Sequence, residues 1–487
     1  ALVRAALSYA EFRKLELAIP GPFSLPVLGN ALTFATVTQN NILETCLRVI
    51  GGRRELCRMS LFNHLVVVAS DPEDIAQVLK RKEFNDKAQF FYGFIRAIAA
   101  KGLLQINGPD WKVHRSALEP ALAKDVIERY IDVFSEEADR FSKSIPREVL
   151  DVHKALALPL VRIFTRTSMM TDDLDSADEQ RLRDSVQLLD QCLAAVNARS
   201  FSPWLWPDFV FNRTSMGRSL KRQLANMREY VDASIVQRRL QAVRDAKVCD
   251  VALARKQILL DKMLQSEAFS DQDMMDEIVT FLSGSTDTSI ATLSFAFKMM
   301  SISPEIQDRV RAEVDDVLGV GADARCVDLH DLPRLQYVEQ VIRETMRILP
   351  PSPFLARQVY QQTELAGKTI PANSTLVVNI HGAHHDPEHW PDPWRFEPER
   401  FADFAPGKSH HPCAFMPFSA GPRRCPASLY AMMSLKIMFA TVMRDHVVEP
   451  VDDGIREAKD FKLTFNVTAR IVGGTWVRFR PRSSLAG

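Results

Sequence analysis

The stretch that decides the fold is Phe418-Ser-Ala-Gly-Pro-Arg-Arg-Cys-Pro-Ala427, which is followed by an apolar segment with helical character, Ser428–Met443. The pattern places Cys425 at the N-cap of that helix and Pro426 at its first position, where the missing N–H costs nothing. The free N–H groups of a helix start lower a thiol pKa and favour the thiolate. The stretch therefore predicts a reactive cysteine next to a buried helix.

Two other residues of this stretch indicate what the cysteine binds. Gly421 permits close backbone approach to a flat ligand, and Arg423 can pair with an anionic group on it. A lone thiolate in an apolar setting suits the proximal ligand of a haem iron. The alternative is that Cys425 is a small buried hydrophobe, which is the usual fate of a free cysteine.

The composition narrows the class of protein. The 487 residues include 61 basic and 61 acidic side chains, with 46% apolar and 25% charged residues. These values are typical of globular chains, and the balanced charge gives no general attraction to nucleic acid. Seven scattered cysteines without a CxxC pair exclude a disulfide scaffold and favour a reducing compartment.

The two ends of the chain differ from its middle in residue pattern and in the secondary structure that this pattern predicts. No run of about 18 uninterrupted apolar residues occurs. Residues 1–29 are predicted to be a linker and Pro-rich connector, with a membrane anchor upstream of Ala1. Residues 30–487 are predicted to form one domain, mainly α with a small β portion (α+β) built from both chain ends. Strands are expected at 65–69, 375–380 and 461–480, the last region turning at Gly473-Gly474.

The pattern F-x-x-G-x-R-x-C-x-A resembles the haem-binding loop of the cytochromes P450, and four further segments match this family in order. They are Trp111–Arg115, Gly284–Ser289, Glu344–Arg347 and Pro398–Phe401. Residues 203–208 and 411–423 look most like the animal family-four clan, which is microsomal and includes fatty-acid ω-hydroxylases. The resemblance covers roughly residues 20–480 and implies a cytochrome P450 fold with a single haem domain.

The resemblance assigns a structural role to one charged group. Glu344 and Arg347 lie i,i+3 on one face of a predicted helix, and Arg400 would complete a buried triad. The triad is expected to support the loop that carries Cys425. E-x-x-R alone carries little weight, because the chain contains it four times.

Other residues are expected to hold the cofactor. Trp111 and Arg115 lie i,i+4 on one helical face and suit a haem propionate, and Arg357 occupies the family position for another. Phe418 and Gly421 of the cysteine loop complete the set with Arg423. An exposed Arg beside an anchoring Trp is the alternative for Trp111 and Arg115.

Asp287 and Thr288 stand in an otherwise apolar helix, where polar groups are costly unless paired or used. By resemblance they are the catalytic pair: Thr288 hydrogen-bonds dioxygen or water, and Asp287 relays protons from solvent. The alternative for Thr288 is a bond back to its own helix. Many family-four proteins carry at the Gly284 position a Glu that links to haem, so we expect non-covalent haem b here, with Cys425 as the axial thiolate.

The substrate pocket is expected to be apolar, which predicts a lipophilic substrate. Its candidate residues, carried over from the family, are Phe91, Phe94, Phe281, Gly284, Phe354 and Phe465. Core packing is the alternative for each phenylalanine. The histidine-rich stretch 381–389 looks like a zinc site, but its spacing lacks a matching second cluster.

The sequence therefore predicts a haem-thiolate monooxygenase that hydroxylates or epoxidises a fatty-acid, terpenoid or steroid-like substrate. Its expected electron donor is a separate NADPH-cytochrome P450 reductase, with cytochrome b5 as a further candidate. The reductase would dock on a basic patch comprising Lys112, His114, Arg424 and Lys436. A peroxide isomerase or dehydratase, which needs no reductase, and a haem sensor or carrier are the alternatives.

Clan resemblance predicts a monomer associated with the cytosolic face of the endoplasmic reticulum membrane. The mitochondrial inner membrane is the alternative location.

Overall fold

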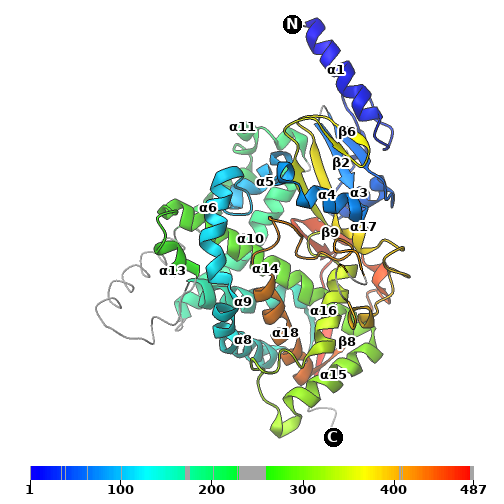
Figure 1. Ribbon diagram of the computed structural model, residues 1–487. Coiled ribbons are helices and arrows are strands. Elements are labelled where there is room, and N and C mark those ends of the chain that lie inside the picture. Colours follow the sequence, from blue (N-terminus) through cyan, green and yellow to red (C-terminus); the bar gives the residue numbers. More distant parts are fainter. Residues whose placement is uncertain are drawn as a thin grey trace.

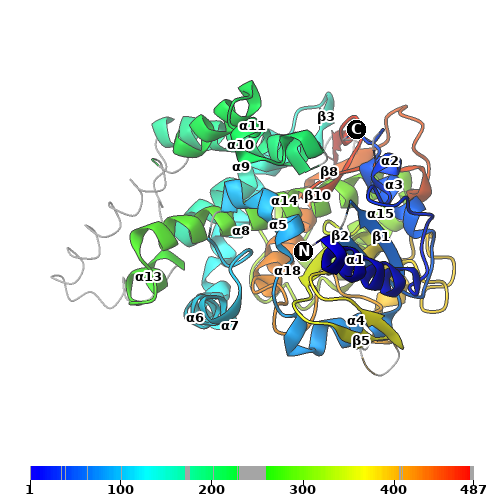
Figure 2. The same ribbon diagram turned by 90° about the horizontal axis from the view of Figure 1, so that it is seen from above.

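The computed structural model describes residues 2–482, except for residues 35, 39, 63, 100, 170–175, 201, 227, 228, 230–258, 405, 406, 408 and 409. A large helical body lies beside a smaller β region, as Figures 1 and 2 show. The long helix α14 passes through the middle of the body. Strands occur in all three predicted segments, and further strands that the sequence analysis did not place form at Cys57–Leu61, Val149–Asp151 and His446–Glu449 among others; the observed architecture is mainly α with a small β portion.

The helices vary from one turn to 32 residues. Their bounds are α1 Leu2–Leu17, α2 Ala31–Phe34, α3 Ile42–Ile50, α4 Pro72–Lys80, α5 Gln89–Ala99, α6 Gly108–Leu118, α7 Lys124–Ile127, α8 Ile131–Ser144, α9 Val152–Phe164, α10 Ser176–Ser200, α11 Asp208–Phe211, α13 Leu259–Leu264, α14 Asp271–Ile302, α15 Pro304–Leu318, α16 Gln336–Ile348, α17 Ile380–His384 and α18 Ser428–Asp445. Short 3₁₀ turns include η5 Pro203–Leu205 and η8 Pro398–Phe401.

The ends of α14 follow from local chemistry. At its start, the Ser270 hydroxyl accepts from the backbone N–H of Asp273, and the Asp273 side chain accepts in return from the Ser270 N–H. This capping box satisfies two N–H groups that have no partner inside the helix. At its end, Pro304 begins α15 in a position where a proline ring is tolerated.

In the part of the chain that the structure describes, the strands form four small sheets. Their bounds are β1 Cys57–Leu61, β2 His64–Ala69, β3 Val149–Asp151, β4 Phe354–Gln358, β5 Thr363–Leu365, β6 Lys368–Ile370, β7 Thr375–Asn379, β8 His446–Glu449, β9 Leu463–Asn466, β10 Thr468–Ile471 and β11 Trp476–Pro481. The largest sheet has the order β1-β2-β7-β4, in which β2 and β7 are parallel. Strand β11 pairs with β3 and β8, and β5 pairs with β6.

The C-terminal hairpin differs from the prediction. The chain reverses at Val467, which joins β9 to β10, and not at Gly473-Gly474. Both glycines have positive φ, but they precede β11, which belongs to another sheet. A glycine pair marks a turn but does not say which strands pair across it.

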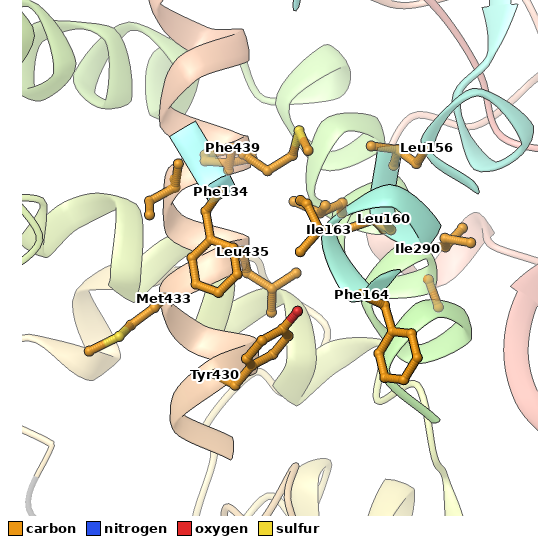
Figure 3. Close-up of a cluster of buried hydrophobic side chains, with 14 of the residues drawn as sticks. Phe134, Leu156, Leu160, Ile163, Phe164, Ile290, Tyr430, Met433, Leu435 and Phe439 are labelled. Atoms are coloured by element: carbon orange, nitrogen blue, oxygen red, sulfur yellow. The ribbon is translucent and has the colours of Figure 1, made fainter. Parts of the chain in front are cut away.

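The helical core gathers where α8, α9, α14 and α18 meet. Figure 3 shows aromatic and aliphatic side chains of these helices in contact, among them Phe134, Leu160, Ile290 and Phe439. Phe134 and Phe439 are no more than 1% exposed. This packing fixes α14 and α18 relative to each other, and both helices lead to the candidate site.

The N-terminal helix α1 projects from the β region (Figure 1). Its last turn is tied down by Glu16, a buried carboxylate that accepts hydrogen bonds from Arg13 and Ser60. Among the described residues, no helix is long and apolar enough to span a bilayer. The domain boundary at residue 29 stays a prediction.

Candidate active site

The cysteine loop closes on itself ahead of α18. The Cys425 N–H donates to the Phe418 carbonyl at 2.9 Å. Helix α18 begins at Ser428 with Ala427 as its N-cap, so the predicted N-cap position of Cys425 is wrong. The half-buried thiol lies before the helix, and desolvation raises its pKa, although a bond from the Ala427 N–H and the charge of Arg115 oppose that rise. The predicted lowering of the pKa is therefore also wrong for the unligated thiol.

Gly421 makes a close approach to another part of the chain that the sequence does not predict, and its contact with a flat ligand stays a prediction. Its φ is +72°, and a Cβ added there would lie 2.2 Å from the Leu79 carbonyl oxygen. The close approach that requires glycine is thus made to α4. Gly421 fixes the position of the cysteine loop against the protein.

Arg423 is buried, and its guanidinium contacts neutral acceptors. It donates to the carbonyl of Asn85 at 2.9 Å and to that of Ile106 at 2.7 Å, and it lies 4.3 Å from the centroid of the Trp111 ring. No carboxylate lies within ion-pair distance of it among the described residues. Burial lowers the pKa of Arg423 to about 10, as does the charge of Arg357. This buried cation still lacks an anion.

Arg357 and Lys87 are two further buried cations that have no anionic partner among the described residues. Arg357 is 2% exposed, and its one hydrogen bond runs to the neighbouring Ala356 carbonyl at 3.5 Å. Lys87 is 6% exposed and donates to the Tyr92 hydroxyl at 3.1 Å. Burial lowers the pKa of both, and the charges of Arg357 and Arg423 lower that of Lys87 further.

The sequence analysis missed Lys87, since nothing in its local pattern separates it from a surface lysine. A cluster of three buried cations is costly without anions. Lys87, Arg357 and Arg423 therefore define an anion-binding wall beside the cysteine loop.

Trp111 and Arg115 lie on α6, as predicted, and both are 8% exposed. Arg115 donates to Glu119 at 2.8 Å and to the carbonyl of Arg424 at 3.0 Å. It therefore holds the cysteine loop one residue before Cys425. Trp111 forms the surface over which the Arg423 guanidinium lies.

One part of α14 is open along an otherwise buried helix. Gly284 is exposed, Thr288 one turn later is half-buried, and a Cβ at Gly284 would meet nothing within 4 Å. The Thr288 hydroxyl donates to the Gly284 carbonyl at 2.7 Å. This is the back-bond that the sequence analysis kept as an alternative, and it leaves the hydroxyl oxygen free to accept.

The Asp287 carboxylate is engaged by a neighbouring hairpin. It is 4% exposed and lies against the β9–β10 hairpin, where it accepts from the Thr468 hydroxyl at 2.6 Å and from Arg470 at 2.7 Å. Burial raises the pKa of Asp287, while Arg470 and Thr468 oppose the rise. The sequence analysis missed both partners, which lie 181 and 183 residues away.

The predicted charged triad lies on α16 and η8. Arg347 donates to both Glu344 oxygens at 2.7 and 2.8 Å, and both side chains are fully buried. Arg400 lies 3.6 Å from Glu344 and pairs more closely with Glu397, at 3.0 Å.

Arg347 also connects the triad to the cysteine loop. It donates to the His384 carbonyl at 2.9 Å, and the His384 ring in turn accepts from the Met416 N–H at 2.9 Å. Burial lowers the pKa of His384 to about 3, so its ring is neutral. Among the described residues, no His, Cys, Asp and Glu side chains form a group that could hold a metal ion.

Several of the pocket candidates make aromatic contacts. Phe354 and Phe465 meet edge to face with their centroids 6.4 Å apart. Phe94 packs against Trp206 at 5.9 Å, while Phe91 is 39% exposed beside Phe90. Phe281 is 9% exposed on α14, one turn before Gly284.

The residues present fit a haem group. A flat dianion would neutralise the wall of buried cations, and the thiol of Cys425 offers an axial ligand. Helix α14 is buried before and after Gly284, and the space beside Gly284 is open. Charge, donor chemistry and space all agree with this cofactor.

Comparison with known proteins decides the family. The sequence profile described as cytochrome P450 matches residues 19–470. The chain belongs to the cytochrome P450 family. It is similar to the probable cytochrome P450 4aa1 of Drosophila melanogaster, with 28% identity over 96% of this chain and 90% of that protein. It is also similar to cytochrome P450 4V2 of Rattus norvegicus, with 26% identity over 99% and 93% of the two chains.

A solved structure supports the fold. A mutant cytochrome P450DA heme domain matches with a TM-score of 0.79 at 21% identity, covering 95% of this chain and 98% of that one. The predicted family, its family-four resemblance and the fold class are confirmed. The chain is thus a haem monooxygenase of the cytochrome P450 family.

Proposed function

We propose that this cytochrome P450 inserts one oxygen atom from O₂ into a lipophilic substrate, with non-covalent haem b bound to Cys425. The observation that carries the proposal is the wall of three buried cations, none with a carboxylate partner among the described residues, beside the half-buried thiol of Cys425. Haem with a thiolate ligand supplies O–O bond cleavage when it is bound. Lys87, Arg357 and Arg423 would hold its propionates, and Trp111 and Arg115 would flank them.

The chain's own residues handle the proton and exclude water. Thr288 presents a hydroxyl on the open part of α14 and can pass a proton toward that opening. Asp287 is the neighbouring acid, and its burial makes it a perturbed group of the kind found at functional sites. Retention of this pair favours oxygenation over the peroxide isomerase and the sensor alternatives.

The substrate is proposed to be apolar. Phe91, Phe94, Phe281, Phe354 and Phe465 supply a lining with no charge, so binding would come from burial at about 25 cal/mol per Å² of apolar surface. Fatty acids, terpenoids and steroids satisfy this chemistry.

A separate reductase is the proposed electron donor, with cytochrome b5 as a further candidate. Lys112 and Arg424 are exposed next to the cysteine loop. His114 and Lys436, which the sequence analysis placed in the same basic patch, are buried: His114 pairs with Glu277, and Lys436 pairs with Glu339. The proposed docking patch therefore reduces to Lys112 and Arg424.

Membrane association is proposed from exposed apolar side chains. They are Leu17, Phe23, Val27, Leu32, Trp204 and Phe209, between 55 and 84% exposed. The elements that carry or flank them, including α1, α2 and α11, lie toward one end of the molecule (Figure 1). Exposed apolar groups in this number mark a binding surface. Family-four resemblance favours the endoplasmic reticulum membrane and a monomer, with the mitochondrial inner membrane as the alternative.

The test is a carbon monoxide difference spectrum of the reduced protein, with Cys425→Ser as the comparison. We expect the thiolate-specific band in the wild type and its loss in the variant. Added reductase should then make NADPH consumption depend on substrate. A wild type without Soret absorption, or full turnover by Cys425→Ser, would refute the proposal, and peroxide turnover without reductase would favour the isomerase.

A further inference from the structure

A cavity of about 390 Å³ lies between α8, α9 and α10, and no residue of the cysteine loop lines it. Its volume falls within the range of small-molecule sites, about 300–1,000 Å³. Spacings of i,i+3 and i,i+4 place side chains of each helix on the cavity wall. These wall residues are Glu137, Phe141 and Ser144 of α8 and Lys154, Leu158 and Arg162 of α9.

The uncharged part of the lining is mainly apolar. It includes Phe141, Ile145, Leu150, Leu158 and Pro159. Phe141 is 4% exposed, whereas Ile145, Leu150 and Leu158 are half-buried. Half-buried aliphatic groups on a concave wall leave apolar area that a hydrocarbon chain can cover, which is favourable in water.

The charged part of the lining is mainly basic. Glu137 is its one acid, and the four cations are Arg140, Lys154, Arg162 and Arg183. Arg162 is buried, but the side chains of Arg140, Lys154 and Arg183 are 54, 77 and 57% exposed. These last three residues, the rim cations, give the mouth of the cavity a positive charge.

The acids near the rim cations accept hydrogen bonds from other groups. Glu137 accepts from Arg166 at 3.0 Å, Glu179 accepts from Arg162, and Asp151 accepts from a backbone N–H at 3.0 Å. The rim cations lie 3.5–3.9 Å from these three acids, which is beyond hydrogen-bond distance. The N–H groups of the rim cations are therefore available to an anion that enters the mouth.

The position of the cavity bears on where its ligand comes from. The exposed apolar side chains that we assign to a membrane lie near α1, α2 and α11, whereas α8 lies in the half of the molecule away from α1 (Figure 1). A ligand of this cavity would therefore arrive from solution.

We propose that this cavity binds a single-chain anionic amphiphile, namely a carboxylate with a hydrocarbon chain. The chain lies on the apolar wall between α8 and α9, and the head group pairs with the rim cations. A small anion would leave the apolar wall uncovered, and a cation would be repelled by the rim. This site is separate from the haem site, and the proposal does not depend on the proposed function.

Three ligands test the two parts of the site by isothermal titration calorimetry of the holoenzyme. They are decanoate, decan-1-ol and acetate, each below the concentration at which it aggregates. We expect decanoate to bind at least about tenfold more tightly than the other two, because only decanoate has both the charge and the chain. Equal binding of acetate, or equal binding of decan-1-ol, would overturn the proposal.

A triple variant locates the site. Replacing the rim cations (Arg140→Gln, Lys154→Gln, Arg183→Gln) should weaken decanoate binding in calorimetry about tenfold or more. The Soret response of the haem to decanoate should stay unchanged, since it reports on the other site. The matched control removes three exposed cations elsewhere on the surface: Lys124→Gln, Arg334→Gln and Lys459→Gln. Equal binding by the two triple variants, or a lost Soret response, would overturn the proposal.

Two further measurements address the wall and the source of the ligand. Half-buried Ala155 lines the cavity, so Ala155→Phe should fill it and reduce decanoate binding without a change of charge. Vesicles of phosphatidylcholine and phosphatidylserine should bind the wild type and the rim-cation variant equally. Decanoate binding that survives Ala155→Phe would contradict the site, and vesicle binding lost in the rim-cation variant would show that the ligand is a bilayer lipid instead.

Discussion

Removing one charge from the buried ion pair of α16 gives the sharpest test of how the cysteine loop is supported. Glu344→Gln keeps the shape of the side chain but leaves the Arg347 guanidinium without its carboxylate. Both side chains are 0% exposed, and Glu344 also accepts from the Glu397 N–H at 3.0 Å. The variant therefore converts a compensated pair into an isolated buried cation.

The expected cost is large. Breaking a buried pair by removing one partner costs about 3–5 kcal/mol, and here at least one charge-assisted hydrogen bond, worth about 1.5–3 kcal/mol, is lost as well as the charge. The cost of breaking the ion pair already includes part of the cost of the lost hydrogen bond, so we expect the free energy of unfolding to fall by about 3–5 kcal/mol in total. Because Arg347 reaches the cysteine loop through His384 and Met416, haem retention should fall with stability.

Urea unfolding followed by tryptophan fluorescence measures the change, since buried Trp390 lies 5.2 Å from the Arg347 guanidinium. Arg343→Gln is the matched control on the same helix. Its partner is Glu339 at 2.6 Å, and its side chain is 36% exposed, so its removal should cost less than about 1 kcal/mol. If Glu344→Gln costs no more than Arg343→Gln, the support role assigned to the pair is wrong.

Four further outcomes follow from the same geometry. Arg357→Met should weaken haem binding about tenfold or more, because a charged hydrogen bond of about 1.5–3 kcal/mol is lost, while the urea midpoint of the cofactor-free protein should rise, because a buried cation without an anion is removed; a haem titration with unchanged affinity would contradict this. Gly284→Ala should stabilise α14 by about 0.5–1 kcal/mol in thermal unfolding yet weaken the substrate-induced spectral shift, and lower stability would show that the opening is not there. Burial lowers the pKa of His114, but the hydrogen bond and charge of Glu277 raise it more, so the net pKa lies above the ordinary value. The extra stability of the wild type over His114→Asn should therefore be full below about pH 6.5 and be lost as the pH rises through the pKa of His114 in the folded protein. A difference in urea midpoint that does not change with pH would count against the pair. Haem should leave the denatured chain in acid solvent, since Gly284 offers no carboxylate for a covalent link.

The sequence predicts the parts of the site that are encoded locally. The cysteine loop and the pair Asp287-Thr288 each lie within one short segment, whereas the E-x-x-R pair, whose spacing occurs four times, is identified by its order among the matching segments. The long helix α14 and the apolar helix α18 also follow from their own periodicity. In these elements, residues that are close in the sequence determine the local structure.

The errors have a common cause in tertiary contacts. Lys436 reads as a surface charge, but its Nζ donates to the Leu332 carbonyl at 2.6 Å and pairs with Glu339. Lys87 becomes buried because β4 passes beside it, through an isolated bridge to Arg357. A lysine or arginine can bury the aliphatic part of its side chain wherever its charged group finds a hydrogen-bond acceptor. The sequence does not show where that acceptor lies in the fold.

The buried charges that lack a partner are positive, which indicates that the ligand bound beside them is an anion. The buried acids Glu344, Asp287 and Glu277 each have a cation of the chain beside them. The buried cations Arg357 and Lys87 have no such acid among the described residues. Buried cations without an anionic partner carry a desolvation cost that an external anion would remove. That cost is repaid when a dianionic cofactor binds, so electrostatics, and not a covalent link, is the physical basis on which this chain would retain haem.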